Sequence, residues 1–237
     1  NKTKMIILNS PHNPTGGMIE KEDLKAIADL AIKHDLIVFS DEIYSGIVFE
    51  GKFNSIFSLD NMKERTIILD GFSKTYAMTG WRIGYGIFPK NIAAHIANLA
   101  INSVSCTATF TQIAAVEALR GSQEGPTKMA DIFKQRAKLI VEGLNDIKGI
   151  NCLMPKGAFY VFPNVTKACK DLGFKDSQEL QSYLLHEAGV AVLPRTSFGI
   201  KNKNESEEYI RLSFATGRDE ILKGLERMKK AIEGKRR

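Results

Sequence analysis

The stretch "TIILDGFSKTYAMTGWRIGYG", residues 66–86, begins with a short apolar run, "TIIL" (66–69), that passes directly into the polar, turn-prone segment "DGFSKT". Two earlier apolar runs, "MIIL" (5–8) and "LIVF" (36–39), have the same length and are followed by "NSPHNPTG" and "SDEIYSG". Apolar runs this short are typical of buried strands. We therefore predict three strands, each of which ends in a polar loop.

The segment between the first two runs, "EKEDLKAIADLAIKHD" (20–35), has the spacing of an amphipathic helix. Its apolar residues Leu24, Ile27, Ala28 and Ala31 recur every three or four positions, as on one helix face. A strand, a helix and a second strand in this order predict a parallel pair of strands. In open parallel sheets, ligands bind beyond the carboxyl ends of the strands.

The polar residues that follow the three predicted strands should therefore face one crevice. These residues are Asn13, Asp41, Tyr44, Ser73 and Lys74. Asn13 follows Pro11 and directly precedes Pro14, and the two prolines restrict the backbone on both sides of its amide.

The rest of the sequence predicts a fourth strand over 81–88 and helices over 89–104 and 109–121. Turn formers gather in "GSQEGP" (121–126), so we place a domain boundary there, between domains 1–125 and 126–237. The second domain should contain helices at 127–149, 177–189 and 217–234 and strands near 151–155, 158–164, 190–194 and 209–215. The expected fold class is α/β: a three-layer α/β/α portion with a mostly parallel sheet, then a smaller α+β domain.

Composition narrows the classes of function. The 237 residues are 43% hydrophobic and 25% charged, with a net charge of +6, and no nucleic-acid motif accompanies that charge. The three cysteines are scattered, the four histidines form no cluster, and no apolar run approaches the length of a membrane span. We expect a cytoplasmic protein with reduced thiols and no metal, nucleic acid or membrane partner. Its first residue is Asn1, so the chain is either processed or the carboxy-terminal part of a longer protein.

Lys74 is the strongest catalytic candidate. It follows a buried strand and enters the predicted crevice, where partial desolvation favours a neutral, nucleophilic amine that can form a Schiff base. Ser73, Arg82 and the turn backbone suit a phosphate group. Asp41 needs a cationic partner: either Lys74 or Arg82 in a structural ion pair, or the protonated ring nitrogen of a cofactor. Tyr44 could bind a phenolate-like oxygen. Together these residues suggest pyridoxal 5'-phosphate as cofactor.

Four motifs carry a resemblance to a known family. "SPHNPTGG", "SDEIYSG", "GFSKTYAMTGWRIGYG" and "YIRLSFA" resemble, in order and spacing, those of the fold type I, class I/II aminotransferases, which include aspartate aminotransferase. The resemblance extends from residue 1 to about residue 230 and implies a pyridoxal-phosphate-dependent enzyme.

The resemblance assigns a role to each residue. It implies that Lys74 forms the internal aldimine and shuttles the substrate proton, while Asp41 keeps the pyridine nitrogen protonated. Tyr44 and Asn13 would donate to the 3' oxygen of the cofactor, and Ser73 and Arg82 would bind its phosphate. Arg211, helped by Asn13, would bind the α-carboxylate of the substrate. The resemblance also implies a cis peptide bond between Asn13 and Pro14.

The sequence departs from the family at two positions and in length. Family members often have a phosphate-binding serine where this chain has Gly71, and many have a glycine where it has Arg195. Arg195 is either a surface residue or reaches toward the substrate. Family members are considerably longer, so the chain resembles a carboxy-terminal portion, one that would leave a sheet edge and an apolar face uncovered and would be a poor catalyst alone.

The expected reaction is transfer of an amino group from an L-amino acid, with an aspartate-like or aromatic side chain, to a 2-oxo acid. The full-length protein would be a homodimer. Two alternatives stay open: a carbon–sulfur β-lyase on the same scaffold, and a non-catalytic, aminotransferase-like regulatory domain.

Overall fold

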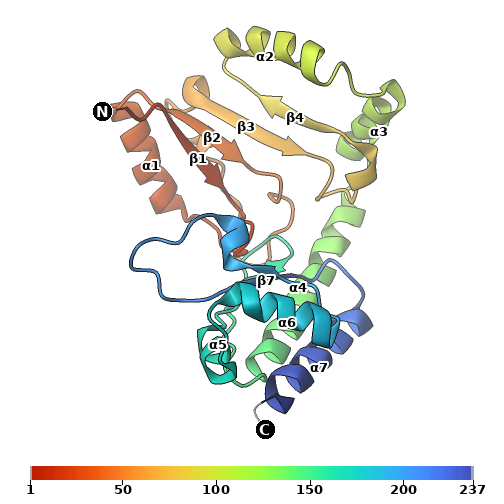
Figure 1. The fold of residues 1–237 in the computed structure, drawn as a ribbon. Coiled ribbons are helices and arrows are strands. Elements are labelled where there is room, and N and C mark those ends of the chain that lie inside the picture. The colour runs from red at the N-terminus through yellow and green to blue at the C-terminus, as the bar shows by residue number, and fades with distance from the viewer. Residues whose placement is uncertain (1, 236–237) are drawn as a thin grey trace. The chain divides into compact units, whose positions relative to one another are not determined.

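The structure, a computed structural model, describes residues 2–235 and divides the chain into two compact units (Figure 1). Unit 1 comprises Asn1–His12, Gly17–Ala130 and Lys156–Ala158, and unit 2 comprises Asn13–Gly16, Asp131–Pro155 and Phe159–Arg237. The long helix α4 (Glu124–Asn145) contributes residues to both units. The boundary near residues 125 and 126 stays a prediction.

Unit 1 is built on a four-stranded sheet with the strand order β1-β2-β3-β4. The strands β1 (Met5–Asn9), β2 (Ile37–Asp41) and β3 (Thr66–Gly71) are parallel, as predicted, and β4 (Gly84–Ile87) is antiparallel to β3. The fourth strand begins later than predicted because η3 (Thr79–Trp81), a 3-10 helix, and the left-handed Arg82 precede it. The predicted fold class, α/β with a mostly parallel sheet, is confirmed.

Helix α1 (Lys21–Lys33) covers one side of this sheet. Its residues Leu24, Ala28 and Ala31 are buried in one cluster with Leu8 of β1 and Val38 of β2. The three-and-four spacing of the helix therefore matches the face that it buries. Burying a leucine or valine side chain completely stabilises a fold by about 1.5–3 kcal/mol.

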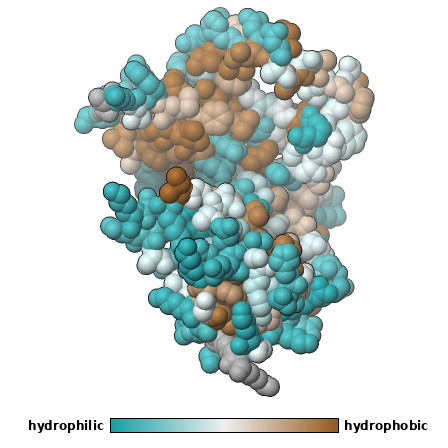
Figure 2. Space-filling view, viewed as in Figure 1, coloured by the Kyte–Doolittle hydropathy of each residue, from teal (hydrophilic) through white to brown (hydrophobic). Residues whose placement is uncertain are grey.

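Part of the sheet in unit 1 is left uncovered by the other elements of this unit. The 3-10 helices η1 (Ile56–Ser58) and η2 (Lys63–Arg65) precede β3, and helices α2 (Lys90–Ser103) and α3 (Thr109–Arg120) follow β4. Hydrophobic side chains gather over the strands (Figure 2), where Met5, Ile7 and Leu69 are 43%, 72% and 42% exposed. The apolar face that we expected to be uncovered is therefore present.

Unit 2 combines a small sheet with helices. The sheet has the order β5-β7-β6, and β7 (Ile210–Ser213) pairs antiparallel with both β5 (Tyr160–Val161) and β6 (Leu193–Pro194). The helices are α5 (Thr166–Leu172), α6 (Ser177–Ala188) and α7 (Arg218–Gly234), and the 3-10 helix η4 (Arg195–Phe198) follows β6. Large side chains buried in this unit include Phe214, Leu180, Leu184, Met228 and Ile232.

One expectation for this unit was wrong, and one helix was missed. The predicted strand near 151–155 is absent: Asn151 forms an isolated bridge with Asn164, and Leu153 is 82% exposed. The amide of Asn145 instead bonds both the N–H and the carbonyl of Cys152, which removes the need for a neighbouring strand. Helix α5, with only seven residues, was too short for its periodicity to be recognised.

Within the described residues, no helix is long and apolar enough to cross a membrane, and no group of three metal-ligating side chains is found.

Candidate functional site

Asp41 is the last residue of β2 and is held by the loop that follows it. The N–H of Ile43 donates a hydrogen bond to Asp41 Oδ1 at 3.2 Å. Partial burial raises the pKa of the Asp41 carboxyl, and the Ile43 bond lowers it in part. No cation among the described residues acts on this pKa. Burial and the Ile43 bond thus account for the direction of this pKa shift.

The loops after β2 and β3 pack closely against each other. Tyr44, in the first loop, is 4% exposed, and Lys74 Nζ, in the second, lies 6.0 Å from the centroid of its ring. A Cβ atom added to Gly46 would lie only 2.5 Å from Cγ2 of Thr75, so the Thr75 side chain packs directly against Gly46. The structure thus brings Tyr44 and Lys74 together, as the topology predicted.

Lys74 stands on an anchored turn. The N–H of Tyr76 bonds the carbonyl of Phe72, and the N–H of Ala77 bonds the carbonyl of Lys74. Phe72 is 3% exposed and contacts the rings of Tyr76 and Tyr85. The buried ring of Phe72 therefore fixes the backbone beside Lys74, whose own side chain is half-buried.

Arg82 lies where η3 meets β4. Its φ angle is 53°, in the left-handed region, and its Nη1 donates to the carbonyl of Thr79 at 2.8 Å. Ser73 is half-buried and Arg82 is exposed, and no described contact joins them. Their role in binding a phosphate stays a prediction.

Two further carboxylates near these loops were not recognised from the sequence. Glu42 is 6% exposed and accepts hydrogen bonds from Ser40 and Ser55 at 3.0 and 2.6 Å. Burial raises the pKa of Glu42, and the two serine bonds oppose that shift. The available signal was the pair "DE" at the end of β2, which places two acids side by side.

The second of these carboxylates, Asp70, precedes Gly71 at the end of β3. It accepts a hydrogen bond from the hydroxyl of Tyr85 at 3.2 Å. Burial raises the pKa of Asp70, and the bonds from Gly71 and Tyr85 lower it in part. Burial and the Asp70 charge raise the pKa of Tyr85 to about 12. Tyr85 is therefore a neutral donor at neutral pH.

The structure explains why a glycine stands at position 71. Gly71 pairs with Gly84 across β3 and β4, and a Cβ atom at Gly71 would lie 2.9 Å from the Cα of Gly84. A serine there would force the two strands apart. The position can contribute only backbone groups to a ligand.

Unit 2 contains the predicted carboxylate-binding residue, Arg211, in the middle of its sheet. Arg211 Nη1 donates to Asn13 Oδ1 at 2.8 Å. Its guanidinium carbon lies 4.4 Å from the ring centroid of Tyr160 and 5.0 Å from that of Phe198. The peptide bond between Asn13 and Pro14 is cis, as expected, and so is that between Ser10 and Pro11.

Tyr160 and Phe198 were not recognised as parts of this arrangement. Aromatic faces favour a cation within about 6 Å, so both rings hold the guanidinium in place. Nothing in the sequence marks them, because Phe198 ends the short helix η4 and Tyr160 stands in a separate strand, β5. The two rings and Asn13 thus orient the Arg211 guanidinium, a planar group of N–H donors that is suited to a carboxylate.

Comparison with known proteins agrees with these features. The family model described as "Aminotransferase class I and II" matches residues 1–227. The chain belongs to the class I and II aminotransferase family.

Similar aminotransferases are known from bacteria and archaea. The chain is 41% identical to an aspartate aminotransferase of Bacillus subtilis over 234 residues, which are 98% of the chain and 58% of that protein. It is 40% identical to aromatic-amino-acid aminotransferase 2 of Thermococcus litoralis over 238 residues, 99% of the chain and 59% of that protein.

A solved structure shows the same fold. The aromatic aminotransferase from Pyrococcus horikoshii is 39% identical, with a TM-score of 0.89 over 98% of this chain and 60% of that one. The chain thus spans less than two thirds of the length of the relatives that it matches.

Proposed function

We propose that the full-length protein transfers an amino group from an L-amino acid to a 2-oxo acid with pyridoxal 5'-phosphate as cofactor. The observation that carries this proposal is the position of Lys74, on an anchored turn at the end of β3 with its amine 6.0 Å from the Tyr44 ring. A second group, the partly buried carboxyl of Asp41, ends the neighbouring strand of the same sheet.

The donor groups in unit 1 fit this cofactor. When bound, pyridoxal 5'-phosphate supplies an aldehyde and a protonated ring that takes up electrons. Asp41 is desolvated and has no cation acting on its pKa among the described residues, so a protonated ring nitrogen suits it. Tyr44 would donate from its hydroxyl to the 3' oxygen, and Ser73 and Arg82 would bind the phosphate. Asn13, which belongs to unit 2, is proposed as a second donor to the 3' oxygen.

Lys74 has two tasks in this proposal. Its amine would hold the cofactor covalently through the aldehyde, which requires the neutral form of the amine. As a free amine near the substrate, Nζ would also be the group that takes up and returns the proton of the substrate Cα. Both tasks need an amine held in one place, and the Phe72 anchor supports this.

Arg211 binds the α-carboxylate of the substrate in this proposal. A guanidinium offers two parallel N–H donors that match a carboxylate, and its contacts with Tyr160 and Phe198 limit its rotation. Asn13 bonds Nη1 and so orients the guanidinium.

The substrates that we propose follow the names of the relatives. Aspartate and aromatic amino acids are the donors in those names, so an aspartate-like or aromatic L-amino acid is the first choice here. We further propose that the full-length protein is a homodimer in the cytoplasm. No observation favours the lyase or the regulatory alternative.

The test is a product assay on the full-length protein with L-aspartate or L-phenylalanine and 2-oxoglutarate. We expect new oxo acid and L-glutamate in equal amounts, and neither product without 2-oxoglutarate. Release of ammonia without an oxo acid would instead indicate a lyase, and no turnover of any tested amino acid would contradict the proposal.

A further inference from the structure

Unit 2 contains a second arginine with a defined set of contacts, Arg195. Its Nε donates to Oε1 of Glu205 at 2.6 Å, and its Nη2 donates to Oε2 at 3.0 Å. The two side chains are only 15% and 19% exposed. A two-bond pair of this kind has a fixed orientation, unlike a single exposed ion pair. Arg195 is therefore neither an idle surface residue nor a charge open to substrate.

Arg195 is close in the chain to Phe198, one of the two rings that contact Arg211, and it directly follows the strand that pairs with the strand of Arg211. Arg195 is the first residue of η4, and Phe198, which lies over the Arg211 guanidinium, is the last. The residue before η4, Pro194, belongs to β6, which pairs with β7 so that Leu193 faces Arg211. The short helix thus places Phe198 directly beside the strand of Arg211.

Arg195 joins η4 to the residue that follows it and to the start of α6. Its Nη1 donates to the carbonyl of Gly199 at 3.1 Å, just after Phe198, and its own N–H donates to Ser177 Oγ at 3.3 Å. Gly199 has a φ of 110°, so the chain leaves the helix through a turn that favours glycine. The guanidinium therefore fixes the exit of η4.

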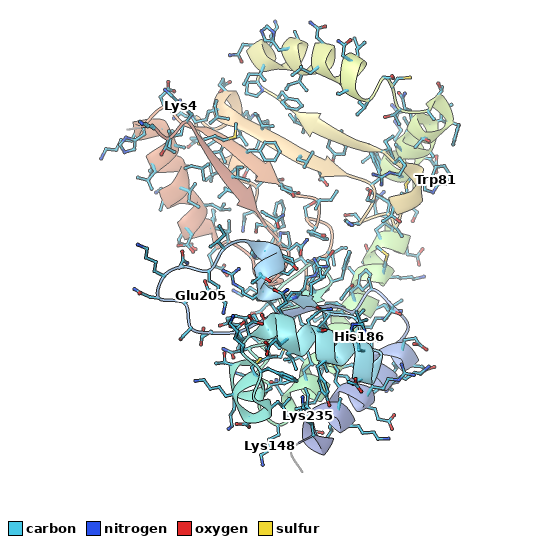
Figure 3. All side chains as sticks on the ribbon, viewed as in Figure 1. Lys4, Trp81, Lys148, His186, Glu205 and Lys235 are labelled. Carbon is cyan, nitrogen blue, oxygen red and sulfur yellow. The ribbon has the colours of Figure 1, made fainter. Side chains whose placement is uncertain are left out.

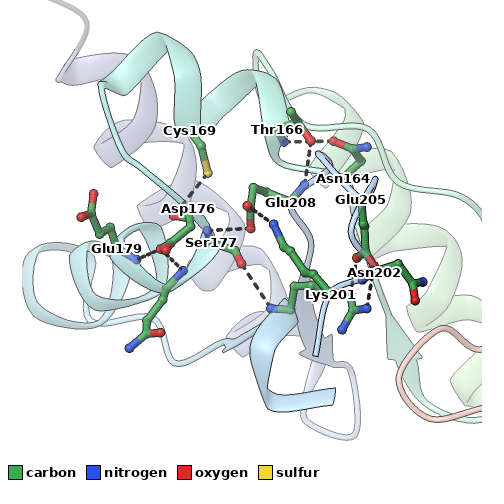
Figure 4. A network of polar contacts seen from close by, with 12 residues as sticks. Asn164, Thr166, Cys169, Asp176, Ser177, Glu179, Lys201, Asn202, Glu205 and Glu208 are labelled. Atoms are coloured by element: carbon green, nitrogen blue, oxygen red, sulfur yellow. Dashed lines mark hydrogen bonds and ion pairs between the residues drawn. The ribbon is translucent and has the colours of Figure 1, made fainter. Parts of the chain in front are cut away.

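Glu205 lies in the loop that leads from η4 to β7 (Figure 3). Its Oε2 also accepts the N–H of Asn202 at 3.2 Å. In the same loop, Lys201 pairs with Glu208. Oε2 of Glu208 accepts the N–H of Ser177, the first residue of α6, at 2.9 Å (Figure 4). These contacts tie the loop to the start of α6.

We propose that Arg195 is a positioning residue for the carboxylate-binding Arg211. Through Glu205 and Gly199 it holds η4 so that the Phe198 ring stays over the Arg211 guanidinium. Glu205 compensates the Arg195 charge, so Arg195 does not compete with Arg211 for an anion. This inference rests on the proposed function, because it takes Arg211 as the group that binds substrate carboxylate.

The proposal is tested on the full-length, cofactor-loaded protein with succinate as the carboxylate probe. Isothermal titration calorimetry would compare wild type with Arg195→Ala, Arg195→Lys, Arg211→Ala and the control Lys229→Ala. Lys229 forms an exposed ion pair with Asp146 in the same unit, so the control removes a pair without touching η4. All titrations are made at a temperature where every variant is folded.

We expect Arg195→Ala to weaken succinate binding about tenfold, the scale of one lost charge-assisted contact. Arg195→Lys should lie between wild type and Ala, because an ammonium keeps the charge but cannot make the two parallel bonds. Hydrogen exchange of the amides at 198–206 should be faster in Arg195→Ala and unchanged in Lys229→Ala.

Two results would overturn the proposal, and they are distinguishable. If Arg211→Ala abolishes succinate binding but Arg195→Ala leaves it unchanged, the positioning role is wrong and the proposed function stands. If Arg211→Ala itself leaves succinate binding unchanged, the role of Arg211 in the proposed function fails as well.

Discussion

Arg211 and Asn13, which are 198 positions apart in the sequence, are joined by a hydrogen bond of 2.8 Å from Arg211 Nη1 to Asn13 Oδ1. The amide oxygen therefore faces the guanidinium, and the cis peptide bond before Pro14 directly follows Asn13. This bond connects the "NPTG" motif to the "YIRLSFA" motif within unit 2.

Asn13→Ala should raise the KM for the amino-acid substrate about tenfold, because a hydrogen bond to a charged group is lost. Its effect on kcat should be smaller if Arg211 binds substrate and transition state alike. Steady-state kinetics of the full-length protein would measure both constants. Asn102→Ala on the exposed surface of α2 is the control, and an unchanged KM in Asn13→Ala would contradict the role of Asn13.

Gly71→Ala should lower the free energy of unfolding by about 1–3 kcal/mol, the usual cost of overpacking. The added Cβ would lie 2.9 Å from the Cα of Gly84, so β3 and β4 must separate. Urea unfolding gives the measurement. Gly80→Ala, where nothing lies within 4 Å of the added atom, is the matched control. An equal free energy of unfolding for the two variants would contradict this prediction, because it would show that β3 and β4 can separate without loss of stability.

Asp41→Asn should stabilise the cofactor-free protein at neutral pH and weaken its affinity for cofactor. Burial raises the folded-state pKa of Asp41 above its ordinary value of 3.8. A raised pKa favours folding below the unfolded value, and this contribution is lost as the pH rises through the folded value. The charged form therefore costs stability at pH 7, while asparagine still accepts the Ile43 bond.

Urea unfolding as a function of pH would test this for Asp41. The stability difference between Asp41→Asn and wild type should shrink as the pH falls toward the ordinary pKa of the acid. A variant that is less stable than wild type at neutral pH would contradict the desolvation argument.

Glu205 should make the opposite contribution. The hydrogen bond from Arg195 lowers the pKa of Glu205 below its ordinary value of 4.5. A lowered pKa stabilises the fold above the unfolded value, and this stability is lost as the pH falls through the folded value. Wild type should therefore be more stable than Glu205→Gln at neutral pH, and the two should converge in acid. Urea midpoints at several pH values measure this, and a constant difference would argue against it.

Much of unit 1 could be predicted from local sequence. The runs "MIIL", "LIVF" and "TIIL" became parallel neighbours, so the loops after β2 and β3 lie at one end of the sheet. This worked because short apolar runs alternate with a helix in one order, and that order restricts the topology. The contact between Lys74 and Tyr44 follows from the same rule.

Contacts that depend on side chains from separate segments could not be predicted. The two rings beside Arg211 come from β5 and η4, and neither stands in a recognisable pattern. The partner of Arg195 stands ten positions later in a loop without periodicity, so the sequence left its role open. The backbone of 151–155 was likewise decided by one side chain, Asn145.

The central claim is that Lys74 carries the cofactor, and borohydride reduction of the full-length protein loaded with pyridoxal 5'-phosphate tests it most directly. Reduction fixes the cofactor on the lysine that binds its aldehyde, and peptide mass spectrometry then identifies that residue. The account predicts a label on the peptide that contains Lys74 and its loss in Lys74→Ala. A label on another lysine, or on none, would contradict it.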